Sequence, residues 1–71
     1  MYVEMYPEKV RALREERGMS KRDLAAAAGV SPKTAGNVES GEPVRSKTAR
    51  KVAAALGIDP PQPLGRPAHR A

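Results

Sequence analysis

At 71 residues, with 13 lysines and arginines against 8 acids, the chain is one small basic domain at most, and a domain of this size buries only around 60% of the surface that its unfolded chain exposes. It has no cysteine, phenylalanine or tryptophan, which excludes disulfides and thiolate-held metals and leaves Val, Leu, Ile, Met and Ala to form the core. No apolar run approaches the roughly 18 residues of a membrane span, and the first residues lack the order of a signal peptide, so we expect a soluble intracellular protein.

Residues 1–6, MYVEMY, are predicted to form an N-terminal arm that has two open interpretations. Its strand-forming and large apolar residues favour pairing with a second copy of the chain or packing against the fourth helix. A frayed terminus is the alternative for six residues without a hairpin partner. The residues concerned are Tyr2, Val3, Met5 and Tyr6.

Two helices are predicted after the arm. Pro7 opens the first at a position where its missing N–H costs no hydrogen bond, and Gly18 ends it. Ser20 caps the second, which runs over residues 21–28, and Asp23 completes a capping box with Asp in place of the usual Glu. The buried faces predicted for these two helices consist of Val10, Leu13, Leu24, Ala25 and Ala28.

Two further helices follow the same rules. Ser31 caps the third, predicted over residues 32–40, and Gly41 ends it. Ser46 is predicted to cap the fourth, and Gly57 closes it. The apolar side of the fourth helix consists of Ala49, Val52, Ala53 and Leu56.

These elements predict an all-α fold of four compact helices over residues 7–58. Residues 59–71 hold four of the seven prolines and little to bury, so we expect a disordered tail with polyproline character there.

The basic excess is concentrated in the middle of the chain. Residues 1–19 carry four cations and four anions, whereas residues 20–51 carry seven cations and three anions. A basic patch on a small domain is the electrostatic footprint expected for nucleic-acid binding. A merely soluble basic surface is the alternative, and charge alone does not separate the two.

Two capped helices joined by a tight turn at GVS, residues 29–31, form a helix-turn-helix, whose second helix can lie in a major groove. The segment LREERGMSKRDLAAAAGVSPKTAGNVESGEPVRSKTARKVAAALGI, residues 13–58, resembles the phage-repressor and Cro family of helix-turn-helix domains, the xenobiotic-response-element type. The shared motifs are the LA of the second helix, the GVS turn, the ExG that ends the third helix and the ALG that ends the fourth. The resemblance implies a lambda-repressor-like fold and binding of double-stranded DNA, often as a homodimer on an inverted-repeat operator. It also implies an ion pair between Arg14 and Glu39 that fixes the third helix.

The family pattern places base reading on the third helix, and this sequence departs from the pattern in two places. Lys21 stands where many relatives have glutamine, and Pro32, where base reading often begins, offers only apolar contact, for example to a thymine methyl. Lys33 is suited to guanine O6 and N7, and Asn37, one turn later, to adenine. Gly36 lies between them, and its bare backbone would allow close approach to DNA. Drift at an exposed position is the competing interpretation of Gly36.

Phosphate contacts position such a domain, while base contacts specify its site. The candidates for phosphate binding lie near the starts of the second and fourth helices and on the third: Lys21, Arg22, Thr34, Ser40, Arg45 and Lys47. Arg50 and Lys51 are more simply interpreted as the solvated side of the fourth helix.

These features predict a small phage-type or bacterial transcriptional regulator, a Cro-like repressor that occludes a promoter in the cytoplasm of a bacterium or a phage-infected host. The alternative is a protein-interaction module, such as an antitoxin or an adaptor for polymerase or a recombinase. Enzymatic activity is not expected, because the single histidine, His69, lies in the predicted tail without a partner nearby. No metal, cofactor, small-molecule ligand or membrane contact is implied.

Overall fold

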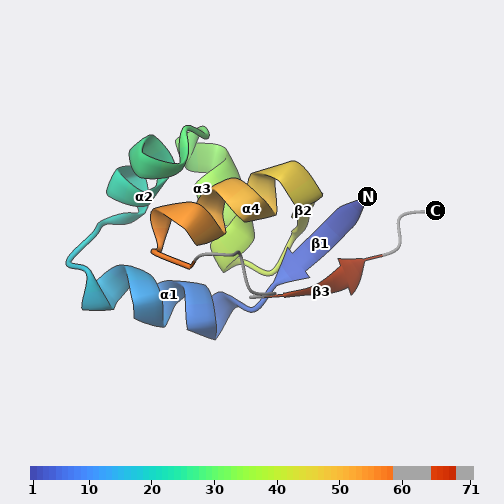
Figure 1. Ribbon diagram of the computed structural model, residues 1–71, viewed down its shortest axis with the longest axis horizontal. Coiled ribbons are helices and arrows are strands. Elements are labelled where there is room, and N and C mark those ends of the chain that lie inside the picture. The colour runs from blue at the N-terminus through green and yellow to red at the C-terminus, as the bar shows by residue number, and fades with distance from the viewer. Residues whose placement is uncertain (59–64, 69–71) are drawn as a thin grey trace.

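The computed structural model describes residues 1–58 and 65–68, with the elements β1 (Tyr2–Met5), α1 (Pro7–Glu16), α2 (Lys21–Ala28), α3 (Pro32–Glu39), β2 (Pro43–Arg45), α4 (Ser46–Ala55) and β3 (Gly65–Ala68). The four helices pack together at one end of the molecule, and the strands form a sheet at the other (Figure 1). The four predicted helices are present, but the expectation of an all-α fold is wrong, because three short strands pair with one another. No helix in the described part of the chain is long and apolar enough to cross a membrane.

Serine side chains begin α2 and α3. Ser20 Oγ accepts a hydrogen bond from the Asp23 N–H at 3.0 Å, and the Ser20 N–H donates to Asp23 Oδ2 at 2.9 Å. Ser31 Oγ accepts from the Thr34 N–H at 3.1 Å. Both caps satisfy donors that the first turn of a helix leaves without an internal partner.

The start of α4 differs from the prediction. Arg45 holds the cap position without a side-chain hydrogen bond, and Ser46 is the first helical residue. The N–H and the hydroxyl of Ser46 both donate to the carbonyl oxygen of Met1, at 3.0 and 3.3 Å. Ser46 therefore does not cap α4, because the N-terminal arm supplies the acceptor at this helix start.

All four helices end in the same motif. The glycine that follows each helix has a φ between 67° and 80°, and the residue after it donates its N–H back to a carbonyl of the last turn, as Met19 does to Arg14 at 3.0 Å. An L side chain is strained at such a φ, so glycine determines where each helix stops. The four glycines are Gly18, Gly29, Gly41 and Gly57.

β1 is the central strand of the antiparallel sheet, whose order is β2-β1-β3. Val3 faces Val44 of β2 on one side and Pro67 of β3 on the other. The prediction of a frayed arm is therefore wrong. The prediction that this strand pairs with a second copy is also wrong, because both of its edges are paired within the chain. The strand does contact α4, which confirms the prediction that the arm packs against the fourth helix. Each outer strand contains a proline, Pro43 or Pro67, which removes a donor that an added strand would need.

β3 lies in the segment predicted to be a disordered tail. That prediction is wrong for residues 65–68, and the rest of the tail, residues 59–64 and 69–71, lies outside the described residues. A Cβ at Gly65 would collide with the carbonyl oxygen of Glu4 and lie 2.6 Å from the Cα of Met5. Glycine thus lets β3 approach β1, and Arg66 Nε then donates to Glu4 Oε1 at 3.0 Å.

The hydrophobic core connects the helices to the sheet. Met5 of β1 is 3% exposed and Val44 of β2 is 7% exposed, and both belong to the same cluster as the helical core. Fully burying an apolar side chain of this size stabilises a fold by about 1.5–3 kcal/mol. The sheet is therefore packed onto the domain and not merely hydrogen-bonded at its edge. The largest fully buried side chains are Val10, Leu24, Val38, Val52 and Leu56.

Candidate nucleic-acid interface

α2 and α3 form the helix-turn-helix of this domain. The Val30 N–H donates to the carbonyl oxygen of Ala25 at 2.9 Å in the turn, and Ser31 then caps α3. Ala35 and Val38 turn into the core, where both have no exposed surface. α3 is thereby held by one face, and its opposite face lies at the surface.

The outward face of α3 carries the residues predicted to read bases. Pro32, Lys33 and Asn37 are exposed, and the last two are one helical turn apart. Gly36 is half-buried, yet a Cβ built on it would meet no atom within 4 Å. The packing of the domain therefore does not require glycine at position 36. Either a contact with a binding partner or neutral sequence drift accounts for the glycine.

The residues predicted to bind phosphate divide into exposed cations and hydroxyls that are engaged within the domain. Thr34 Oγ1 lies 2.9 Å from Ser31 Oγ, and the Ser40 hydroxyl donates to the Gly36 carbonyl oxygen at 2.9 Å. A phosphate oxygen only accepts hydrogen bonds, so Ser40 reaches one only by turning away from Gly36. The four cations, at the starts of α2 and α4, are all exposed: Lys21, Arg22, Arg45 and Lys47.

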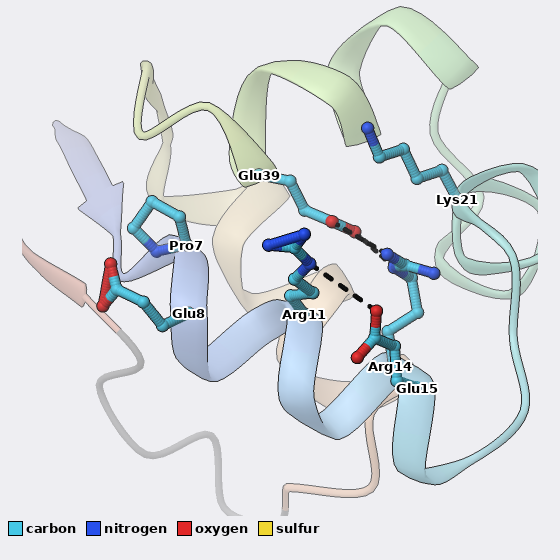
Figure 2. Close-up of a pocket in the computed structure, with 7 residues that line it drawn as sticks. All are labelled: Pro7, Glu8, Arg11, Arg14, Glu15, Lys21 and Glu39. Carbon is cyan, nitrogen blue, oxygen red and sulfur yellow. Dashed lines mark hydrogen bonds and ion pairs between the residues drawn. The ribbon is translucent and has the colours of Figure 1, made fainter.

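The ion pair implied for Arg14 and Glu39 is present (Figure 2). Arg14 Nε donates to Glu39 Oε2 at 2.6 Å and Nη2 donates to Oε1 at 3.1 Å, while Nη1 donates to the carbonyl oxygen of Met19 at 2.8 Å. The two side chains are 11% and 6% exposed. The hydrogen bonds to Glu39 raise the pKa of Arg14 above its ordinary value, with burial acting in the opposite direction. The pair connects α1 to the end of α3 and so fixes the position of α3.

A hollow surrounds this ion pair on the side of α1 and the start of α2 (Figure 2). Three cations and three acids line it, so it favours neither an anion nor a cation. We attribute the hollow to the packing of side chains around the pair. Its lining residues are Pro7, Glu8, Arg11, Arg14, Glu15, Lys21 and Glu39. Among residues 1–58 and 65–68, no group of three His, Cys, Asp or Glu side chains is placed to hold a metal ion.

Among the described residues, internal contacts distinguish the cations of residues 20–51 from the arginines outside that range; Lys9, also outside it, contacts the Tyr6 ring and no acceptor oxygen. Each described arginine outside residues 20–51 contacts a carboxylate or a carbonyl oxygen: Arg11, Arg14, Arg17 and Arg66. None of the seven cations within residues 20–51 has such a partner in the described part of the chain. Two of the three acids there are engaged, Asp23 with Ser20 and Glu39 with Arg14. The basic excess therefore remains available at the surface around the helix-turn-helix.

Sequence reasoning missed Tyr2 as a neighbour of the candidate interface. β1 places Tyr2 opposite Arg45, and Arg45 Cζ lies 5.9 Å from the centre of the Tyr2 ring. The strand-forming residues of the arm were a signal for β1. Its partner β2 has only three residues and begins with a proline, so no pattern in the sequence distinguishes it from a loop.

Comparison with known proteins agrees with this geometry. Two capped helices around a tight turn, with an exposed outward face on the second and exposed cations at the starts of α2 and α4, define a helix-turn-helix DNA-binding domain. The chain matches the family model described as Helix-turn-helix over residues 10–62, well over half of its length, and it belongs to this family, the phage-repressor and Cro type. β1 and β3 lie outside the matched residues. No curated protein matches the chain.

Proposed function

We propose that this chain is a sequence-specific transcriptional regulator that places α3 in the major groove of duplex DNA. The observation that carries the proposal is the contrast between the seven cations of residues 20–51, which have no internal acceptor among the described residues, and the arginines elsewhere, which do. Cations without an internal partner bind phosphate without first breaking an ion pair, and the counterions that they displace favour the complex.

The outward face of α3 reads the bases. Lys33 donates to guanine O6 and N7, Asn37 bonds adenine with two hydrogen bonds, and Pro32 contacts a thymine methyl. Gly36 brings the helix backbone close to the base edges. Each good base contact of this kind discriminates against a wrong base by about 1–3 kcal/mol.

The main phosphate contacts are made by the four exposed cations at the starts of α2 and α4, which are Lys21, Arg22, Arg45 and Lys47. Thr34 and Ser40 contribute less, because their hydroxyls are engaged within the domain. The free backbone N–H groups of the first helical turns add to these contacts.

On a promoter, such a domain acts as a Cro-like repressor by occluding polymerase, in the cytoplasm of a bacterium or a phage-infected cell. Two copies bind an inverted repeat, so that each half-site receives one α3. Their interface uses surfaces other than the edges of β1, since β2 and β3 occupy both. No catalytic step is part of this proposal.

The experiment is selection of bound duplexes from a random DNA pool at about 0.15 M salt, where non-specific phosphate binding is weakened. An enriched inverted repeat with half-sites about one helical turn apart supports a dimer that reads sequence. A single enriched half-site supports base reading by one copy and overturns the dimer.

Matched lysine variants test the base-reading face on the enriched duplex. Lys33→Ala is expected to relax specificity at one base pair and to weaken binding by about 1–3 kcal/mol. Lys51→Ala removes another exposed lysine, on α4, and is expected to leave the preferred sequence unchanged. A pool without enrichment overturns sequence reading and favours the protein-interaction alternative.

A further inference from the structure

The sheet connects the N-terminal strand to the segment that carries Arg45. Tyr2 of β1 lies directly opposite Arg45 of β2, and Glu4 lies opposite Pro43. Side chains alternate between the faces of a strand, so Tyr2 and Glu4 share one face while Val3 and Met5 share the other, on the side of the core. Tyr2 and Arg45 are therefore neighbours on the face of the sheet turned away from the core.

Among the described residues, the Arg45 guanidinium lies over an aromatic ring but donates no hydrogen bond. Its Cζ lies 5.9 Å from the centre of the Tyr2 ring. Within residues 1–58 and 65–68, no carboxylate or carbonyl oxygen accepts a hydrogen bond from it, in contrast to the guanidinium of Arg14 or Arg66. A guanidinium that lies over a ring keeps its in-plane N–H groups free, and these are the donors that bind phosphate in pairs.

The same strand also holds the start of α4. The Met1 carbonyl oxygen accepts hydrogen bonds from the N–H of Ser46 at 3.0 Å and from its hydroxyl at 3.3 Å. The backbone on both sides of Arg45 is thus fixed by β1, through the β1–β2 pairing and through Ser46. A side chain that is already held in one region loses less conformational freedom when it binds.

We propose that Tyr2 is a positioning residue for a DNA phosphate contact made by Arg45, and that β1 is a strand added to the helix-turn-helix domain for this purpose. β1 lies outside residues 10–62, which match the family. The inference rests on the proposed function, and it identifies a residue that acts on DNA through Arg45 without touching the major groove.

The test measures binding of the full chain to a mixed-sequence duplex of about 25 base pairs, between about 50 and 200 mM salt. Arg45→Ala is expected to reduce the slope of log affinity against log salt by about 0.9, the value for one lost phosphate contact. Tyr2→Val, which keeps strand propensity, is expected to weaken binding about two- to fivefold in the natural chain and to have no further effect in the Arg45→Ala background. Tyr2→Phe retains the ring and is expected to bind like the natural chain.

Tyr6→Val is the matched control. Lys9 Nζ lies 5.2 Å from the centre of the Tyr6 ring, so this variant removes the same kind of contact at the start of α1. Its affinity and salt slope are expected to equal those of the natural chain. Melting curves for every variant show which of them remain folded at the assay temperature, and the Tyr2→Phe comparison stays informative if Tyr2→Val loosens the sheet.

The outcomes separate this inference from the proposed function. The positioning role is overturned if Tyr2→Val lowers the affinity for DNA equally in the natural chain and in the Arg45→Ala background. It is also overturned if Tyr2→Phe lowers the affinity as much as Tyr2→Val does. An unchanged slope for Arg45→Ala together with a reduced slope for Lys21→Ala also overturns it, while leaving DNA binding intact. Absence of salt-dependent binding by the natural chain overturns both.

Discussion

Arg14 and Glu39 join α1 to the end of α3 through two hydrogen bonds, of 2.6 and 3.1 Å, between side chains that are 11% and 6% exposed. A third hydrogen bond, from Arg14 to the Met19 carbonyl oxygen at 2.8 Å, satisfies the remaining side of the guanidinium. Because both charges are buried, each is compensated only while the other is present. The orientation of α3 therefore depends on a contact that lies away from its outward face.

Removing one partner of this pair should destabilise the domain strongly. Glu39→Gln leaves Arg14 as a buried charge without a counter-charge, so the free energy of unfolding is expected to fall by about 3 kcal/mol or more. Urea denaturation measures this change. Arg11→Ala breaks an exposed pair with Glu15, whose atoms are 3.5 Å apart, and should change stability by less than about 1 kcal/mol. A comparable loss for the two variants would contradict the structural role of Arg14 and Glu39.

Gly36→Ala should change stability and DNA binding in opposite directions. An alanine Cβ meets no atom within 4 Å, so replacing a mid-helix glycine is expected to raise the free energy of unfolding by up to about 1 kcal/mol. If the bare backbone approaches the bases, the added methyl group lengthens the neighbouring base contacts and weakens operator binding by about 1–3 kcal/mol. Urea denaturation and titration of the selected duplex measure the two effects. A variant that is more stable and binds the duplex as tightly as the natural chain would show that the glycine at position 36 is a product of neutral sequence drift.

The helices could be predicted from the sequence because their signals are local. Ser20 and Asp23 lie three residues apart, Ser31 precedes Pro32, and a glycine follows each helix, so the starts of α2 and α3 and the ends of all four helices depend on neighbours in the chain. The prediction at Ser46 failed for the opposite reason, because the acceptor that replaces its cap is not local: it is the carbonyl oxygen of Met1, 45 residues away. The outward face of α3 followed from helical periodicity once α3 was located.

The sheet could not be predicted, because its signals are not local. β2 has three residues and β3 has four, and each contains a proline that argues against a strand. The pairing becomes favourable only when β1 lies between them and Met5 and Val44 enter the core. The contact between Tyr2 and Arg45 depends on that pairing, so this part of the candidate interface was also inaccessible to pattern reasoning.

Gly65→Ala should separate β3 from β1. The new Cβ would collide with the Glu4 carbonyl oxygen and lie 2.6 Å from the Met5 Cα, and backbone atoms cannot move aside as the end of a side chain can. We expect a loss of about 1–3 kcal/mol in the free energy of unfolding and faster amide hydrogen exchange in β1. Ala68→Gly in the same strand is the control for a small change at the edge of the sheet. Unchanged exchange in β1 after Gly65→Ala would show that β3 does not depend on this close approach.

The capping box of α2 should make stability depend on pH through Asp23. The Ser20 N–H, and to a lesser degree its hydroxyl, lowers the pKa of Asp23 below its ordinary value of 3.8. A carboxyl whose pKa is lower in the folded state contributes stability that is complete above its unfolded pKa and is lost as the pH falls through the folded pKa. Asp23→Asn should therefore be less stable than the natural chain at neutral pH, and the difference should shrink as the pH falls below about 4. Urea midpoints of both proteins at pH values on either side of this range provide the measurement. Comparing the two at each pH removes the contribution of the other acids, and a difference that stays constant with pH would show that the Asp23 charge does not stabilise α2.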